Sequence, residues 1–222
     1  MNDFIVYKKS AEEIAKLFLE IKAVTFRFNP PYTYTSGLKS PIYLDNRLVM
    51  SYPDVRKKIV DYYIDAIKKE IGLKNIEWIS ATATAAILQG AWIADKLNLP
   101  MVYVRPTTKA YGKGGKVEGY IKKGSKVLIV EDHISTAESV ANNAQSIRKL
   151  NGRVEYCITT TTYETKQSLQ TLKKNNLKLI ALTSGKIIVK TAFKEKYLSK
   201  KEKEMVDLWF EEPSIWEEKL KK

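Results

Sequence analysis

Between residues 76 and 182, short apolar runs alternate with segments of helical periodicity, and this alternation limits the possible folds more than any other feature. The runs with strand character are IEWISA, MVYVR, KVLIVE, RVEYCITTTT and LKLIAL. The intervening segments TAAILQGAWIADKL, AESVANNAQSIRKLNG and SLQTLKKNN have the period of helices. Strands that alternate with helices at this spacing predict an α/β fold with a mainly parallel sheet flanked by helices.

The segments outside this region predict further helices and no second domain. Ser10, with a glutamate three residues later, forms a capping-box pattern, so a helix is expected to begin there. Pro53 favours a second helix that ends at Gly72. Residues 194–222 form a charged tail of helical pattern, whose tryptophans are expected to pack onto the domain. The length is consistent with a single domain over residues 1–222.

The composition argues against several classes of protein. No run of about 18 apolar residues occurs, so no membrane span is expected, and the start lacks the pattern of a signal peptide. The single cysteine, Cys157, cannot form an internal disulfide, which fits a reducing cytoplasm. The net charge of +13 indicates either an anionic partner or a lysine-rich solvated surface. Because the lysines are spread along the chain, nucleic acid is not expected as a partner.

Two adjacent acids, Glu131 and Asp132, follow the apolar run VLIV directly. In a parallel α/β sheet, ligands bind beyond the carboxyl ends of the strands. Carboxylates at that place can accept hydrogen bonds from vicinal hydroxyls, as on a ribose. The next residues, ISTAES, offer hydroxyls and the N–H groups of a helix N-terminus, which attract phosphate. The pattern therefore indicates either a site for a phosphorylated sugar or an ordinary strand end before a capped helix.

Half of the ten glycines lie within residues 112–124, next to several cations. Arg105 and Lys109 precede this glycine-rich stretch, and Lys113 and Lys116 lie within it. Glycine lets the backbone move and approach a ligand closely. The stretch is therefore interpreted as a basic lid over an anionic substrate or, alternatively, as a solvated hairpin tip.

These features together resemble the type I phosphoribosyltransferases, and in particular the orotate branch. Residues 127–139 are similar to the 13-residue motif that binds phosphoribosyl pyrophosphate (PRPP). YTYTSGLKSPIYLDNR resembles the N-terminal substrate segment, YVRPTTKAYGKGGKVEG the flexible loop, and ISATATAAIL the pyrophosphate loop. The resemblance implies the type I phosphoribosyltransferase fold, with an N-terminal helix and a small hood within residues 1–50.

The resemblance also implies a reaction, a cofactor and an assembly. Orotate would displace pyrophosphate from PRPP and give orotidine monophosphate, in pyrimidine nucleotide biosynthesis in the cytoplasm. Mg²⁺ would be held mainly by PRPP, with no direct protein ligand. A homodimer is expected, in which the loop of residues 105–117 reaches the neighbouring site.

The resemblance assigns roles by position. Catalysis would fall to Lys109 and Asp132. PRPP would contact Arg105, Lys109 and Tyr111 of the loop, and Glu131, Asp132, His133, Ile134, Ser135, Thr136, Ala137, Glu138 and Ser139 of the motif. The base would contact Thr35, Tyr43, Leu44, Ser135 and Tyr163, and the pyrophosphate loop would include Thr84 and Ala85.

Several positions depart from the family pattern. Pro106 removes a cation, and Tyr163 stands where an arginine pairs with the orotate carboxylate. The Cβ of Ala137, where glycine is usual, is expected to crowd the phosphate turn or to forbid a positive φ. Glu138 is expected to point away from the phosphate, where it supports the helix start. His133 is interpreted as a packing or hydrogen-bonding residue or, alternatively, as a proton carrier for the base.

These departures leave two alternatives to orotate transfer open. The first is a phosphoribosyltransferase for another nucleobase, which Tyr163 motivates. The second is a non-catalytic relative that binds PRPP or a nucleotide and has a regulatory role.

Overall fold

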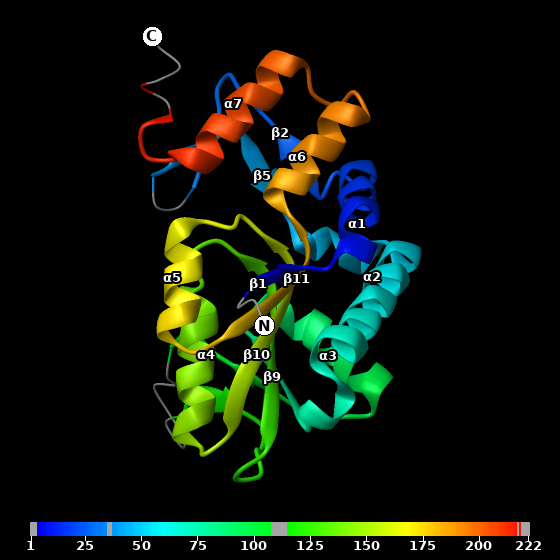
Figure 1. The fold of residues 1–222 in the computed structure, drawn as a ribbon, viewed down its shortest axis with the longest axis vertical. Helices are drawn as coiled ribbons and strands as arrows, with labels where there is room; N and C mark the ends of the chain where they lie inside the picture. The colour runs from blue at the N-terminus through cyan, green and yellow to red at the C-terminus, as the bar shows by residue number, and fades with distance from the viewer. Residues whose placement is uncertain (1–3, 35–36, 108–114, 217, 219–222) are drawn as a thin grey trace.

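The computed structural model describes residues 4–34, 37–107, 115–216 and 218. Its centre is a sheet with strand order β1-β11-β10-β9-β6-β7-β8, and Figure 1 shows helices on both sides of it. All neighbouring pairs are parallel except β7 and β8. The strands are β1 Phe4–Val6, β6 Trp78–Thr82, β7 Met101–Val104, β8 Val117–Glu118, β9 Lys126–Ile134, β10 Arg153–Thr162 and β11 Lys178–Ser184. The predicted α/β fold with a mainly parallel sheet is confirmed.

The helices fall into two groups around the sheet (Figure 1). One side carries α1 (Lys8–Glu20), α2 (Pro53–Ala66) and α3 (Ala86–Leu97). The other side carries α4 (Glu138–Lys149) and α5 (Lys166–Lys174). The chain then forms α6 (Gly185–Lys194) and α7 (Lys200–Glu211).

The central strand β9 is buried on both faces, which explains its continuous apolar run. Leu128 and Val130 enter the core on one side, and Val127 and Ile129 enter the core on the other. Successive side chains of a strand point to opposite faces, so a strand covered by helices on both sides has no polar face. Cys157 on β10 is also buried in this core.

Two residues near helix ends have roles that their local sequence does not show. The helix α1 begins at Lys8, so the capping box predicted at Ser10 is wrong. Ser10 lies inside the helix, and its Oγ donates to Leu182 O at 2.7 Å. Gly152 does not take the positive φ that ends the helix, because Asn151 has it, at 62°. Gly152 is needed for space, since a Cβ there would lie 2.6 Å from Ile147 Cγ2.

Short strands between α1 and α2 form a hood above the sheet (Figure 1). The pairs are β2 (Val24–Phe26) with β5 (Ile42–Leu44), and β3 (Tyr32–Thr33) with β4 (Lys39–Ser40). The helix α7 lies against these hood strands, because Trp209 Nε1 donates to Lys39 O at 2.8 Å.

Helical turns complete the connections around α2. These turns are η1 (Asn46–Ser51), η2 (Ile67–Ile71) and η3 (Leu73–Asn75). Because the π-helical turn η2 continues α2 without a break, the predicted end of the second helix at Gly72 is confirmed, and Gly72 has a φ of 82°.

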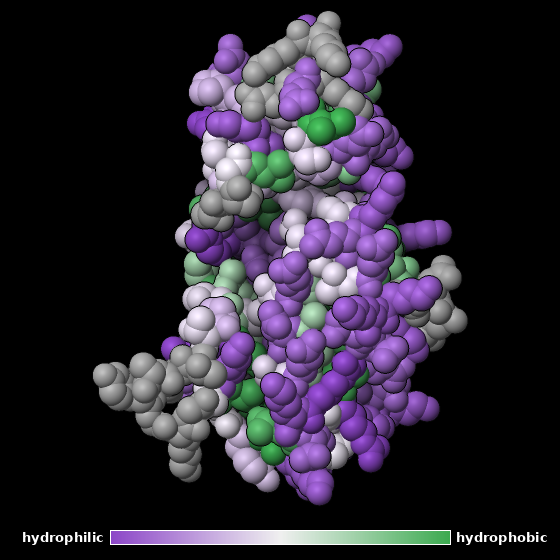
Figure 2. Space-filling view, turned by 90° about the vertical axis from the view of Figure 1, so that its left-hand side faces the viewer, coloured by the Kyte–Doolittle hydropathy of each residue, from purple (hydrophilic) through white to green (hydrophobic). Residues whose placement is uncertain are grey.

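One side of the molecular surface is largely hydrophilic. Figure 2 shows the left-hand side of Figure 1, where hydrophilic side chains cover most of the face. Exposed lysines of α5, namely Lys166, Lys173 and Lys174, belong to this side. Within the described ranges, no helix has both the length and the apolar character that crossing a bilayer requires.

Candidate active site

The paired acids lie near the carboxyl end of β9, which continues to Ile134. The register of β6 and β9 pairs Ala81 with Val130, so Thr82 stands beside Glu131. After Thr82 the chain turns through a cis peptide bond between Ala83 and Thr84 and enters α3 at Ala86. The predicted pyrophosphate loop, with Thr84 and Ala85, is therefore adjacent to the predicted ribose-binding acids.

Burial makes the charged form of both acids unfavourable. Glu131 is 6% exposed, and its Oε1 accepts a hydrogen bond from Asp132 N at 3.1 Å. Burial, followed by the neighbouring Asp132 charge, raises the pKa of Glu131 well above its ordinary value. Burial also raises the pKa of Asp132. Two carboxylates in this setting are stabilised by a ligand that brings hydrogen-bond donors or a cation.

A tight turn joins the acids to the N-terminus of α4. Ser135 is exposed and Thr136 partly exposed, and Ala137 precedes the helix in the left-handed conformation, with φ 63° and ψ 11°. Backbone N–H groups at such a turn and at a helix N-terminus form an anion site. The turn and helix start thus suit a phosphate group.

Ala137 and Glu138 show how this sequence accommodates its departures from the usual motif. The expectation that a Cβ at position 137 forbids a positive φ is wrong, because the residue adopts one while 4% exposed. The left-handed conformation costs an alanine roughly 1–2 kcal/mol. Glu138 points toward α5, where its Oε1 accepts from Gln167 Nε2 at 3.2 Å. The predicted outward orientation of Glu138 is confirmed.

The strand β10 and the start of α5 hold the turn in place. Thr162 Oγ1 and Tyr163 N both donate to Ile134 O, at 3.1 Å and 3.0 Å. Thr165 Oγ1 donates to Ser135 O at 2.6 Å. These contacts fix the backbone on which the predicted phosphate site depends.

The other predicted substrate residues lie around this edge of the sheet or outside the described residues. Arg105 follows β7, and its Nη1 lies 3.5 Å from Glu118 Oε1. Tyr43 and Leu44 are on the hood strand β5, and the Tyr43 ring lies 5.4 Å from the Tyr32 ring. Thr35, Lys109 and Tyr111 fall outside the described residues.

Tyr163 is the centre of an aromatic cluster that includes the C-terminal helix. Its ring lies 4.3 Å from the His133 ring and 5.4 Å from the Trp209 ring of α7. Its hydroxyl lies 3.3 Å from the Tyr34 hydroxyl. Burial raises the pKa of Tyr163 well above its ordinary value, so this position contributes a neutral aromatic group. The cluster lies beside the motif and under the hood.

His133 is held as a neutral imidazole. Its Nδ1 lies 2.9 Å from Thr161 Oγ1, and burial lowers the pKa of His133 to about 4. Its Nε2 is buried and, within the described part of the chain, has no hydrogen-bond partner. The geometry is that of a packing and hydrogen-bonding residue at neutral pH.

Three residues near this site are not identifiable from sequence patterns. Tyr34 and Trp209 join the aromatic cluster from the hood and from α7, and Asn46 donates to Asp132 O. The only signal in the sequence was the presence of aromatic residues in the substrate segment and in the charged tail.

Comparison with known proteins gives the family. No protein-family model matches the chain. The orotate phosphoribosyltransferase of Coxiella burnetii is 42% identical over 207 residues, which are 93% of this chain and 98% of that protein. The enzyme of the same name from Listeria monocytogenes is 38% identical over 92% of this chain and 97% of its own length. The chain belongs to the orotate phosphoribosyltransferase family.

Solved structures agree with this orotate phosphoribosyltransferase assignment at the level of the fold. The orotate phosphoribosyltransferase from Aeropyrum pernix has a TM-score of 0.73 and 22% sequence identity, and the match covers 84% of this chain and 99% of that one. The predicted type I phosphoribosyltransferase fold is confirmed.

In this orotate phosphoribosyltransferase relative, Gly185 lets α7 pack against Tyr163. A Cβ on Gly185 would lie 2.7 Å from Phe210 Cζ and 2.9 Å from Tyr163 Cδ1. Gly185→Ala is therefore expected to lower the free energy of unfolding by about 1–3 kcal/mol, the usual cost of overpacking. Urea denaturation measures the change. Gly115→Ala is the control, because a Cβ there meets nothing closer than 3.9 Å, and equal losses in both variants would contradict the packing.

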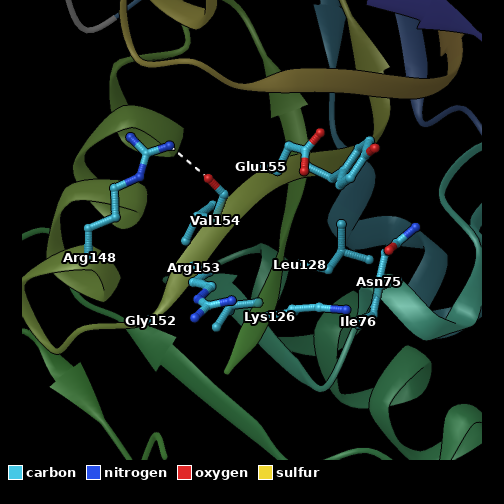
Figure 3. Close-up of a pocket in the computed structure, with 11 residues that line it drawn as sticks. Asn75, Ile76, Lys126, Leu128, Arg148, Gly152, Arg153, Val154 and Glu155 are labelled. Atoms are coloured by element: carbon cyan, nitrogen blue, oxygen red, sulfur yellow. Dashed lines mark hydrogen bonds between the residues drawn. The ribbon is translucent and has the colours of Figure 1, made fainter. Parts of the chain in front are cut away.

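A cavity of about 460 Å³ lies at the other end of the sheet from the acids. Figure 3 shows its lining, which comes from the amino ends of β9 and β10 and includes Lys126 and Arg153. Arg148 is turned to the backbone, and its Nη2 donates to Val154 O at 2.8 Å. The cavity is therefore separate from the site that the family membership indicates.

Proposed function

We propose that the protein transfers the phosphoribosyl group from PRPP to orotate, with release of pyrophosphate, in pyrimidine nucleotide biosynthesis. The observation that carries the proposal is the arrangement of Glu131 and Asp132 near the carboxyl end of β9, which leads through a short turn with the left-handed residue Ala137 to the N-terminus of α4. Carboxylates of this kind accept hydrogen bonds from ribose hydroxyls, and the turn binds the phosphate. The names of the related proteins support orotate as the base.

Each part of the site has a role in this reaction. Glu131 and Asp132 hold the 2- and 3-hydroxyls of the ribose, and residues 135–139 surround the 5-phosphate. Arg105 and Lys109 bind pyrophosphate, and Lys109 stabilises the charge that develops on this leaving group. The reacting carbon gains positive charge in an oxocarbenium-like transition state, so the protein acts mainly by positioning and electrostatic stabilisation.

Magnesium would enter with the substrate. Among the described residues, no group of three or more His, Cys, Asp or Glu could hold a metal ion. Mg²⁺ keeps several waters and favours phosphate oxygens, so PRPP itself would supply most of its ligands, while Glu131 and Asp132 hold the ribose. Bound Mg²⁺ would neutralise charge on the pyrophosphate.

The base would lie under the hood, against β5 and the aromatic cluster. Tyr43 and Leu44 line this region from β5, and Thr35 belongs to the same segment. The neutral, buried Tyr163 favours one alternative, a phosphoribosyltransferase for a base without a carboxylate, because an arginine is absent at this position.

We further propose a homodimer in the cytoplasm, in which the loop of residues 105–117 completes the neighbouring site.

A pyrophosphate-release assay with a panel of bases tests the function. Release from PRPP is expected with orotate and Mg²⁺, and not with adenine, guanine, hypoxanthine or uracil. Lys109→Ala is expected to lower kcat by about 100-fold or more, as when a single group that stabilises transition-state charge is removed. Lys122→Ala, in the exposed turn before β9, is the matched control. Turnover of another base in place of orotate would overturn the assignment of the substrate.

A further inference from the structure

One buried amide connects the hood to the paired acids. Asn46 is the first residue of η1, two positions after the end of the hood strand β5. It is 2% exposed, and its Nδ2 donates to Asp132 O at 2.7 Å across 86 residues of sequence. The same Nδ2 also donates to Thr161 Oγ1 at 3.1 Å.

Thr161 makes this connection a network rather than a single contact. Thr161 Oγ1 accepts a hydrogen bond from Asn46 Nδ2 and donates one to Asp132 O at 3.4 Å. It also lies 2.9 Å from His133 Nδ1. The network therefore fixes the main chain on both sides of the Asp132 carbonyl. Because the main chain sets the direction of the side chain, the network also sets the direction of the Asp132 carboxylate.

The network contains two of the three buried side-chain atoms that lack a hydrogen-bond partner among the described residues. These atoms are Asn46 Oδ1 and His133 Nε2, and the third is Gln89 Oε1. A buried acceptor without a partner is unfavourable, so Asn46 is held by its Nδ2 donors. Both hydrogen bonds go to residues near the carboxyl ends of β9 and β10, where Asp132 lies.

We propose that Asn46 is a positioning residue, which couples the base-binding strand to the ribose-binding acids. It touches neither the base nor the reacting carbon, and it acts through the Asp132 backbone. A shift of β5 when a base binds reaches Asp132 through this amide, because η1 begins at Asn46, two residues after the strand ends. The inference rests on the proposed function, since it takes Asp132 as a ribose ligand.

Calorimetric titration with ribose 5-phosphate tests the proposal without requiring turnover. Asn46→Leu keeps the size of the side chain and removes its donors, so the affinity is expected to fall by about 10- to 100-fold, the typical effect of losing a group that orients a ligand-binding residue. Asn46→Ala removes the same donors without adding a charge, so it is expected to give a loss in the same direction. It serves as the second variant if Asn46→Leu fails to fold.

Ser10→Ala is the matched control. It also deletes a buried hydrogen bond between distant segments, from Ser10 Oγ to Leu182 O, and it is expected to leave the affinity for ribose 5-phosphate within twofold of the parent. If the folded Asn46 variants bind as tightly as the parent, the inference is overturned and the proposed function stands. If the parent itself does not bind, both are overturned.

The split between kcat and KM gives a second measurement. Misplacement of Asp132 is expected to lower kcat for orotate transfer by about 10- to 100-fold, whereas a purely structural role would lower only the melting temperature. In the Ser10→Ala control, kcat is expected to stay at the parent value. Equal kcat in the parent and in both Asn46 variants would also overturn the proposal.

Discussion

His133→Gln is expected to make the protein more resistant to acid than the parent. Burial lowers the pKa of His133 to about 4 in the folded protein, whereas an unfolded histidine titrates near pH ~6.5. Between these pH values the unfolded chain binds a proton that the folded protein does not. The free energy of unfolding of the parent therefore falls as the pH decreases through this window, by up to about 3 kcal/mol. Glutamine cannot titrate, so the variant does not undergo this loss.

Urea denaturation at a series of pH values from neutral down to the folded pKa measures the effect. The raised pKa of Glu131 acts in the opposite direction, because the folded protein then binds the proton more tightly than the unfolded chain. That contribution is common to the parent and the variant, so it cancels in their difference. Ser10→Ala removes a polar group that does not titrate, so its free energy of unfolding plotted against pH is expected to run parallel to that of the parent. A parallel curve for His133→Gln would contradict the buried neutral imidazole.

The double variant Glu131→Gln, Asp132→Asn is expected to be more stable than the parent in the absence of ligand. Burial raises the pKa of both carboxyls, so the folded protein binds these protons more tightly than the unfolded chain. The stability that this binding gives at low pH is lost as the pH rises through the folded pKa values. Amides of the same shape carry no charge at pH 7. The gain is expected to be roughly 3 kcal/mol, the repulsion of two like charges a few ångströms apart at an effective dielectric constant of about 20.

The dependence of this gain on pH identifies its cause. At pH values below both the folded and the unfolded pKa values, the carboxyls are protonated in either state, and the gain is expected to disappear. Denaturation of both proteins in urea at neutral and acidic pH gives the comparison. A double variant that is less stable than the parent at pH 7 would show that the acids contribute to folding, contrary to the electrostatic account.

The features that could be predicted from sequence depend on local patterns. The apolar run of β9 and the acids after it are adjacent in the chain, so the run and the position of Glu131 and Asp132 together predict the site, although the strand itself continues through the acids to Ile134. The end of the second helix at Gly72 could be predicted because a positive φ there is a local requirement. The capping box at Ser10 failed because a distant carbonyl, Leu182 O, binds the hydroxyl instead.

The parts of the site that could not be predicted involve partners far apart in sequence. Asn46 meets Asp132 across 86 residues, and Trp209 meets Lys39 across 170 residues. No periodicity or spacing reports such contacts. The buried position of Tyr163 likewise depends on α7, which belongs to a tail whose sequence shows only charge and helical pattern.

Calorimetric titration with PRPP tests the central claim most directly, that the paired acids and the following turn hold a phosphorylated pentose. The parent is expected to bind PRPP in the presence of Mg²⁺. The double variant Glu131→Gln, Asp132→Asn is expected to lose about 100-fold in affinity or more, since hydrogen bonds to charged groups contribute about 1.5–3 kcal/mol each. Glu155→Gln, whose side chain lines the cavity at the other end of the sheet, is expected to bind like the parent. Equal affinity of the parent and the double variant would contradict the claim.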